Sequence, residues 1–291
     1  MMINGNRTIA FALTSAVKLL SQNPEISSPR LDCEILLSHV LNCERIQLIL
    51  QKDDILSDEI LTKFSSLVQR RFQNEPVGYL TGAREFMSLT FNVRPGILIP
   101  RPETEFLVEY VVDSMKSIKN PTILDLCTGS GAIAVSVAYY LAEASVVAVD
   151  KFDICVDIAM DNARENHVEK QVSVMQHDIF EQFPINTVFD CIVSNPPYIK
   201  KDILTTLPSD VKDYEPGYAL DGGKDGLAFY RRIIELTQRH LKPNGILVLE
   251  IGYDQGEDLV QLLEKTNEFQ NIKVTKDYAE LDRMVTATKR G

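Results

Sequence analysis

Hydrophobic and polar positions alternate along the chain in two different rhythms. From about residue 6 to residue 73, apolar residues recur every three or four positions, as in Ile9, Leu13 and Val17. This spacing predicts amphipathic helices, and Ser57 before two acidic residues marks the start of one of them. The first part of the chain is therefore expected to be a small all-helical domain.

The pattern changes to short extended segments after Pro76. Two of these, Glu85–Met87 and Leu89–Val93, are separated and flanked by turn residues, which predicts a β-hairpin. Pro102 then suits the first position of a helix, where its missing N–H is not needed. These changes divide the chain into three expected parts: a helical domain over residues 1–75, a β-hairpin linker over residues 76–101, and a larger domain over residues 102–291.

The remainder of the chain alternates between short β-rich runs and helical stretches. Strands are predicted at Thr122–Leu126, Ser145–Val149, Val172–Met175, Phe189–Val193, Ile246–Glu250, Ile272–Thr275 and Met284–Thr288. Helices are predicted at Ala132–Tyr140, Ile154–Asn166, Leu227–His240 and Gly256–Glu264. Such alternation favours an α/β fold with a mostly parallel sheet covered by helices on both faces. The last two strands lack a helix-length spacer, so we expect them to form an antiparallel hairpin.

Composition and charge narrow the classes of protein. The 291 residues include 30 Lys and Arg against 41 Asp and Glu, a net charge of −11, which disfavours a nucleic-acid-binding protein. The longest apolar runs are far below the roughly 20 residues of a membrane span. The five cysteines form no C-x-x-C pair and the four histidines show no metal-ligand spacing, so neither a disulfide framework nor a metal site is expected. We expect a cytoplasmic protein.

A glycine-rich turn follows the first predicted strand of the alternating region. Gly129 and Gly131 precede a helix, where glycine lets the backbone turn tightly and a ligand approach main-chain N–H groups. Asp150 ends the next strand about 20 residues further on, where a carboxylate can accept hydrogen bonds from ribose hydroxyls. The pair indicates an adenosine-containing cofactor. With Ala134 the turn also satisfies the dinucleotide fingerprint, so nicotinamide and S-adenosylmethionine enzymes fit it about equally.

A second motif separates these two classes. Asn195-Pro196-Pro197-Tyr198 follows a later strand, at the sheet edge where ligands of such folds bind. The prolines stiffen the turn. The Asn195 oxygen and an adjacent carbonyl can accept both hydrogens of a planar –NH₂ group, while Tyr198 stacks on its plane. That arrangement would aim the nitrogen lone pair at a sulfonium methyl group, although the motif alone also fits a plain proline turn with a packing tyrosine.

A series of motifs in order along the chain now identifies a family. They are Gly78-Tyr-Leu-Thr-Gly82 with Glu85-Phe86, Ile99-Pro-Arg-Pro-Glu-Thr-Glu105, Asp125-Leu-x-Thr-Gly-Ser-Gly131, Ser194-Asn-Pro-Pro-Tyr198, Tyr214-Glu-Pro216, Ala219-Leu-Asp-Gly-Gly223 with Asp225-Gly-Leu227, and Leu249-Glu-Ile-Gly252. Together they resemble the HemK/PrmC methyltransferases, which methylate the glutamine of the Gly-Gly-Gln motif in class I peptide chain release factors. The resemblance runs from Pro76 to the C-terminus, and the helical domain matches in size and character.

The resemblance implies a fold, a cofactor and a set of site residues. The fold is a seven-stranded, mostly parallel Rossmann-like methyltransferase sheet, and the cofactor is S-adenosyl-L-methionine, with S-adenosyl-L-homocysteine as product. The implied cofactor-binding residues are Cys127, Thr128, Gly129, Ser130, Gly131, Asp150, Asp178, Ile179 and Asn195. The implied substrate-binding residues are Asn195, Pro196, Pro197 and Tyr198, of which Asn195, Pro196 and Tyr198 are catalytic.

Some residues depart from the family pattern or carry weaker predictions. Cys127 stands where the family usually has glycine, and Ile179 where relatives often have an aromatic residue. Glu85 and Phe86 on the hairpin are candidates for lining the substrate cleft, but they could equally pack or solvate the hairpin. The long stretch after Tyr198 is interpreted as a loop that covers the substrate.

The leading hypothesis is therefore a release factor glutamine methyltransferase that works as a monomer, with its helical domain docking the protein substrate. A ribosomal-protein glutamine methyltransferase would share the chemistry. A DNA adenine methyltransferase would share the Asn-Pro-Pro-Tyr motif, but it must flip a base from a duplex, and the acidic balance disfavours it. A binding module without turnover and a nicotinamide oxidoreductase are the alternatives from other classes.

Overall fold

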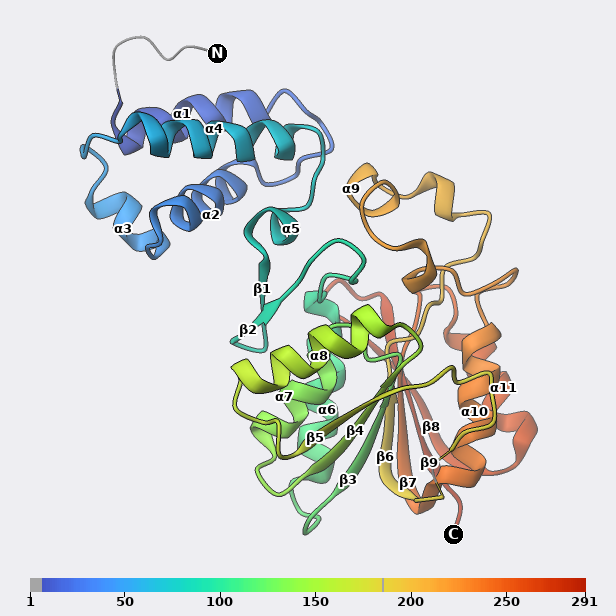
Figure 1. Cartoon of the computed structure of the whole chain (residues 1–291). Helices are drawn as coiled ribbons and strands as arrows, with labels where there is room; N and C mark the ends of the chain where they lie inside the picture. The colour runs from blue at the N-terminus through green and yellow to red at the C-terminus, as the bar shows by residue number, and fades with distance from the viewer. Residues whose placement is uncertain (1–6, 185) are drawn as a thin grey trace. The chain divides into compact units, whose positions relative to one another are not determined.

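The computed structural model describes residues 7–184 and 186–291 (Figure 1). Contacts divide the chain into two compact units. One contains the described residues up to Ala83 together with Leu207–Tyr214, and the other contains Arg84–Thr206 and Glu215–Gly291. The part of the predicted helical domain that precedes Arg7 lies outside the described residues.

The first unit is helical, as its hydrophobic spacing predicts. Its helices are α1 (Ile9–Leu20), α2 (Pro29–Leu41), α3 (Arg45–Leu50), α4 (Asp58–Phe72), α5 (Val77–Thr81) and α9 (Ser209–Lys212). The Ser57 side chain accepts a hydrogen bond from the backbone N–H of Ile60 and so caps α4. Leu20, Leu36 and Phe64 meet in the apolar core between α1, α2 and α4.

A short segment from much later in the sequence, Leu207–Tyr214, completes this unit. The Tyr214 hydroxyl donates a hydrogen bond of 2.8 Å to the carbonyl of Gln73, and the backbone N–H of Ser209 donates one of 3.2 Å to the Glu25 carboxylate. Leu207–Tyr214 therefore belongs with the helices near the N-terminus, although the residues on either side of it belong to the second unit. No periodicity in the sequence indicates this association.

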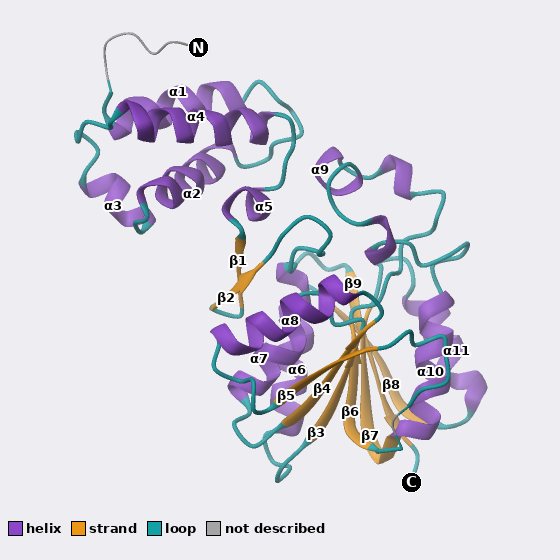
Figure 2. Cartoon of the chain, in the orientation of Figure 1, coloured by secondary structure: helices purple, strands orange, loops and turns teal. Residues whose placement is uncertain are grey.

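The second unit is a sheet with helices on both faces (Figure 2). Its main strands are β3 (Thr122–Leu126), β4 (Ser145–Asp150), β5 (Val172–Gln176), β6 (Phe189–Ser194), β7 (Leu241–Glu250), β8 (Phe269–Lys276) and β9 (Asp282–Lys289). Its helices are η1 (Pro102–Thr104), α6 (Glu105–Met115), α7 (Ala132–Tyr140), α8 (Asp153–Glu165), η2 (Leu204–Thr206), η3 (Gly217–Ala219), α10 (Ala228–His240) and α11 (Gly256–Thr266). Helices α6, α7 and α8 cover one face, and α10 and α11 cover the other.

The strand order explains where ligands can bind. The seven-stranded sheet in the described part of the chain has the order β5-β4-β3-β6-β7-β9-β8, with β3 to β7 parallel and β9 antiparallel to β7 and β8. The predicted mostly parallel fold and its final antiparallel hairpin are confirmed. Between β3 and β6 the order reverses direction, and the carboxyl ends of strands at such a switch point form the usual binding crevice.

The predicted hairpin consists of β1 (Ala83–Phe86) and β2 (Leu89–Asn92). Phe86 is almost fully buried and packs edge-to-face on Phe91, with ring centroids 5.8 Å apart. Glu85 is exposed. Among the described helices, none is both long and apolar enough to cross a membrane.

Candidate active site

The glycine turn between β3 and α7 has a backbone conformation that accounts for its residues. Cys127, Gly129 and Gly131 have positive φ angles of 60°, 57° and 80°. A Cβ atom at Gly131 would lie only 3.0 Å from the Cβ of Ala159 on α8, so a side chain there would collide with the neighbouring helix. Cys127 adopts the left-handed conformation despite its side chain, which explains why glycine would be the easier residue at that position.

Two buried carboxylates hold the turn in place. Asp150, at the end of β4, accepts hydrogen bonds from the backbone N–H groups of Gly129 (2.9 Å) and Phe152 (3.1 Å). Burial raises the pKa of Asp150, although these amide hydrogen bonds partly offset the effect. Asp125 accepts hydrogen bonds from the Thr128 hydroxyl (2.6 Å) and the backbone N–H of Ala134 (3.2 Å). Burial raises its pKa to about 7, against these hydrogen bonds.

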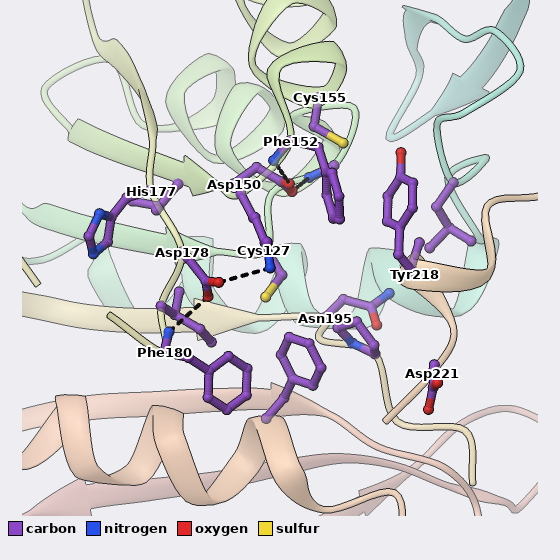
Figure 3. Close-up of a pocket in the computed structure, with 18 residues that line it drawn as sticks. Cys127, Asp150, Phe152, Cys155, His177, Asp178, Phe180, Asn195, Tyr218 and Asp221 are labelled. Carbon is purple, nitrogen blue, oxygen red and sulfur yellow. Dashed lines mark hydrogen bonds and ion pairs between the residues drawn. The ribbon is translucent and has the colours of Figure 1, made fainter. Parts of the chain in front are cut away.

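A cavity of about 300 Å³ opens in front of this turn (Figure 3). Its lining residues are Leu98, Cys127, Gly129, Val149, Asp150, Lys151, Phe152, Cys155, His177, Asp178, Ile179, Phe180, Asn195, Pro197, Tyr218, Ala219, Asp221 and Phe229. Most of this lining is apolar, with a few polar groups that converge on the space, which is the usual character of a small-molecule site.

The side walls of the cavity come from separate loops. The rings of Phe152 and Tyr218 stack with centroids 3.7 Å apart on one side, and Phe180 meets Phe229 edge-to-face on another. Asp178 accepts a hydrogen bond of 2.9 Å from the backbone N–H of Phe180. Burial opposes the ionisation of Asp178, but this hydrogen bond and the ion pair with Lys151 outweigh burial and lower its pKa.

The Asn-Pro-Pro-Tyr turn lies where β6 ends, and Asn195 reaches the cavity from there. The Asn195 side-chain amide donates a hydrogen bond of 3.0 Å to the Thr104 hydroxyl, which donates one of 2.6 Å to the Glu250 carboxylate. The Tyr198 hydroxyl donates a hydrogen bond of 3.3 Å to the same carboxylate. The turn is therefore supported by residues of η1 and β7 as well as by its own prolines.

The main chain of Tyr198 is held just as closely. The buried Gln255 side chain donates hydrogen bonds to the carbonyls of Tyr198 (3.1 Å) and Gly226 (3.2 Å). A Cβ atom at Gly222 would lie 2.7 Å from the Tyr198 backbone, and one at Gly226 would lie 2.5 Å from the Tyr198 carbonyl oxygen. Because Gly222 and Gly226 have no side chains, their loop can pack its main chain directly against the main chain of Tyr198.

An ion pair anchors the loop that returns to this unit. Arg101 donates hydrogen bonds of 2.7 Å to both carboxylate oxygens of Glu215, whose side chain is buried. Arg101 comes from the Ile-Pro-Arg-Pro motif and Glu215 from Tyr-Glu-Pro, so two motifs that lie far apart in the sequence meet here.

The structure brings together many of the residues that the sequence indicated. The predicted residues that line the cavity are Cys127, Gly129, Asp150, Asp178, Ile179, Asn195 and Pro197. Thr128, Ser130 and Gly131 shape the turn behind the lining, and Pro196 and Tyr198 lie beside the cavity. Phe86 packs into the core and Glu85 faces away from it, so neither hairpin residue is part of the lining.

Sequence reasoning missed several lining residues. Phe152 follows Asp150 by two positions, so its proximity could have been inferred from the strand end. Tyr218 lies between the two motifs of the loop interpreted as a cover, but its stacking partner is not visible in the sequence. Phe229 on α10 and Cys155 on α8 carry no sequence signal.

Asp, His and Cys side chains, which are residue types that bind metal ions in proteins, are among those that line the cavity. Among the residues that the structure describes, no three His, Cys, Asp or Glu side chains gather in a group that could hold a metal ion. The five cysteines are free. Burial, with the charges of Asp150 and Asp125, raises the pKa of Cys127 well above its usual value, so this thiol is neutral.

Comparison with known proteins supports the same interpretation. Residues 12–82 match the family described as PrmC N-terminal domain, and residues 102–207 match the methyltransferase small domain. The chain is 40% identical over 262 residues to the release factor glutamine methyltransferase of Clostridium acetobutylicum, covering 89% of this chain and 91% of that protein. It is 39% identical to the enzyme of the same name from Moorella thermoacetica, covering 97% of this chain and 99% of that protein.

Solved structures share the fold at low sequence identity. A methyltransferase from Pyrococcus furiosus is similar with a TM-score of 0.52 and 19% identity, covering 78% of this chain and all (100%) of that chain. Human methyltransferase 10 domain containing protein has a TM-score of 0.52 and 17% identity, covering 70% of this chain and 90% of that chain.

The glycine turn, Asp150 and the Asn-Pro-Pro-Tyr turn around one cavity of a Rossmann-like sheet define a methyltransferase. The sequence identity of about 40% to the two release factor glutamine methyltransferases, over most of each chain, narrows this class to one family. The chain belongs to the HemK/PrmC family of release factor glutamine methyltransferases.

Proposed function

We propose that the protein transfers a methyl group from S-adenosylmethionine to the side-chain amide nitrogen of the glutamine in the Gly-Gly-Gln motif of class I peptide chain release factors. The observation that carries this proposal is the Asn195 side chain. It enters the same cavity as Asp150 and Gly129 from a proline-stiffened turn, and its own –NH₂ group is already occupied by Thr104.

The residues around the cavity fit S-adenosylmethionine. Gly129 presents its backbone to the cavity, and a Cβ atom there would meet nothing within 4 Å, so the turn leaves room for a ligand against the main chain. Asp150 offers its remaining carboxylate lone pairs to ribose hydroxyls. The buried His177 Nε2 atom in the lining has no partner among the described protein atoms. Ile179 and Phe180 provide an apolar surface of the kind that an adenine ring packs against.

When bound, S-adenosylmethionine supplies an electrophilic methyl group and becomes S-adenosylhomocysteine. The protein's own contribution is to hold the substrate amide. With its –NH₂ group donating to Thr104, Asn195 turns its side-chain oxygen toward the substrate, where it can accept one amide hydrogen, and a carbonyl of the Pro196–Pro197 turn can accept the other. As the N–C bond forms, one of these protons leaves the nitrogen for solvent. Acceptors placed where charge develops are each worth about 3–4 kcal/mol, by analogy with oxyanion-hole donors.

The proposed site therefore has two parts. Cofactor binding is assigned to Cys127–Gly131, Asp150, Asp178, Ile179 and Asn195. Substrate binding is assigned to Asn195–Tyr198, with Asn195, Pro196 and Tyr198 in contact with the reacting amide. Glu85 and Phe86 lie outside the lining of this cavity, and their assignment to the substrate cleft stays a separate prediction.

The partner follows from the chemistry of the target. A glutamine within a protein loop needs a protein-sized docking surface, and we assign that role to the helical unit. The relatives from Clostridium acetobutylicum and Moorella thermoacetica carry release factor in their names, which supports this partner over a ribosomal protein or DNA. The protein would act in the cytoplasm as a monomer, because release factors work there and one chain contains all the assigned residues.

Mass spectrometry of purified release factor tests this function. The release factor is incubated with S-adenosylmethionine and either the wild-type protein or Asn195→Ala, and the Gly-Gly-Gln peptide is then analysed. We expect one added methyl group on the glutamine with the wild type and almost none with the variant, with unchanged thermal unfolding of the variant. Methylation of a ribosomal protein or of adenine in DNA, with release factor unmodified, would replace the proposed substrate.

A further inference from the structure

A buried chain of hydrogen bonds lies directly behind the Asn-Pro-Pro-Tyr turn. It runs from Asn195 to Thr104 (3.0 Å), from Thr104 to Glu250 (2.6 Å), and from Tyr198 to Glu250 (3.3 Å). Thr104 is 4% exposed and Glu250 is 1% exposed. The residues come from η1, the end of β7 and the turn after β6, so three separate parts of the fold converge on one carboxylate.

The number of protons on each group determines which group donates in each of these hydrogen bonds. A hydroxyl has one proton, and the short contact with Glu250 shows that Thr104 donates its proton to the carboxylate. The Thr104 oxygen can then only accept from Asn195, so the Asn195 –NH₂ group points at Thr104 and its side-chain oxygen is left for a ligand. The same carboxylate accepts the Tyr198 hydroxyl through its other oxygen.

We propose that Thr104 and Glu250 are positioning residues for methyl transfer, with the ionised Glu250 carboxylate setting the orientation of the Asn195 amide through Thr104 and anchoring the Tyr198 ring. This inference rests on the proposed function. It assigns a role to two residues that do not line the cavity. Thr104 and Glu250 bond to each other although they lie 146 positions apart in the sequence.

Protonation of Glu250 would exchange the donor and acceptor roles in these hydrogen bonds. A protonated carboxyl group can donate to Thr104, and the Thr104 proton is then free to point at Asn195. The Asn195 amide would turn its oxygen toward Thr104 and its –NH₂ group toward the substrate –NH₂ group, where two donors face each other and no hydrogen bond forms. The reaction should therefore slow as Glu250 becomes protonated.

The surroundings of Glu250 place this event in an accessible pH range. Burial raises its pKa to about 7, opposed by the hydrogen bonds from Thr104 and Tyr198 and by the charge of Arg283 on β9. Glu103 on η1 acts in the same direction as burial. Arg283 is itself paired with Asp277 at 3.1 Å, and Tyr230 on α10 donates to the backbone carbonyl of Glu250 at 2.8 Å.

Three substitutions and one control test the role by kinetics. Thr104→Val removes the hydroxyl at nearly constant shape, and Thr104→Ser restores it. Glu250→Gln keeps the shape but can donate to Thr104 at every pH. The control is Thr237→Val, which removes an equally buried hydroxyl that donates only to the carbonyl of Ile233 within α10.

We expect Thr104→Val and Glu250→Gln to lower kcat for release factor on the order of a hundredfold, the size expected when a reacting group is misplaced. The KM for S-adenosylmethionine should change much less than kcat, because neither Thr104 nor Glu250 lines the cavity and Asn195 alone connects them to it. Thr104→Ser should recover most of the rate, and Thr237→Val should leave it unchanged. The wild-type rate should fall below about pH 7, and the slow Glu250→Gln variant should lose that pH dependence. Variants with wild-type kcat, or the same pH dependence in Glu250→Gln, would overturn the proposal.

A second measurement needs no turnover. In protein with ¹⁵N-labelled asparagine, the side-chain amide signals of Asn195 are assigned by their loss in Asn195→Ala. They should shift with pH in the wild type and not in Thr104→Val or Glu250→Gln. An Asn195 signal that does not respond to pH in the wild type refutes the positioning role. A wild-type protein that shows the titration but leaves release factor unmethylated refutes the proposed substrate and leaves the positioning role standing.

Discussion

The two glycines of the turn after β3 provide the sharpest test of the fold around the site. Both have positive φ, 57° at Gly129 and 80° at Gly131, so alanine at either position carries about 1–2 kcal/mol of backbone strain. Only at Gly131 would the added methyl group collide, at 3.0 Å from the Ala159 Cβ and 3.1 Å from its Cα. Overpacking of this kind costs about 1–3 kcal/mol more.

Gly131→Ala should therefore lower the free energy of unfolding by about 2–5 kcal/mol, and Gly129→Ala by about 1–2 kcal/mol. With a urea dependence of about 2 kcal/mol per molar, the unfolding midpoint of Gly131→Ala should fall by roughly 1–2.5 M. Cofactor affinity should rank the two variants in the opposite order, because Gly129 lines the cavity and Gly131 does not.

Urea unfolding followed by circular dichroism measures the first quantity, and calorimetric titration with S-adenosylhomocysteine measures the second. Each variant serves as the control for the other, since both share the backbone strain. Equal unfolding midpoints would show that close packing against α8 does not determine the residue at 131. Equal losses of affinity would show that Gly129 is not at the ligand surface.

Two further predictions concern buried charges. Burial raises the pKa of Asp125 to about 7 in the folded protein, from about 3.9 in the unfolded chain. Because the carboxyl group ionises more readily in the unfolded chain, the free energy of unfolding falls as the pH rises from about 4 to about 7. Asp125→Asn should therefore gain stability relative to the wild type between pH 5 and pH 8, measured by urea unfolding, and an unchanged difference at the two pH values would contradict this. Asp32→Ala leaves the buried Arg71 without its 2.7 Å partner and should lower the free energy of unfolding by about 3–5 kcal/mol. Lys63→Ala, which breaks the exposed pair with Glu59, should cost less than about 1 kcal/mol, and similar losses in the two variants would refute the distinction.

The secondary structure of the sheet unit could be predicted closely because its signals are local. The helix Ala132–Tyr140 and the strand Thr122–Leu126 have the predicted bounds, since a glycine turn separates them and buried strands are short apolar runs. β7 begins five residues before the predicted Ile246, at Leu241, because its first part includes a polar stretch around Asn244 that resembles a turn.

Site residues could be predicted where they follow a strand end. Asp150 and Asn195 do so, and both line the cavity. Tyr218 and Thr104 could not be found in this way, because each is held by a partner that is distant in the sequence. Tyr218 stacks on Phe152, and Thr104 donates a hydrogen bond to Glu250. Contacts of that kind depend on how loops pack, and no periodicity records them. The hairpin residue Phe86 is buried in the apolar core and packs on Phe91, a contact that the extended pattern of the hairpin does not specify.

The path of the chain through Leu207–Tyr214 means that the polypeptide passes between the two units three times, after Ala83, after Thr206 and after Tyr214. The polypeptide leaves the sheet unit after Thr206, contributes α9 to the helical unit, and returns at Glu215. Tyr198 lies eight residues before Thr206, where the chain leaves the sheet unit, and Glu215, which pairs with Arg101, is the first residue after the chain returns. Deleting the first 75 residues would therefore leave Leu207–Tyr214 without the helices it packs against, including the hydrogen bonds of Tyr214 to Gln73 and of Ser209 to Glu25.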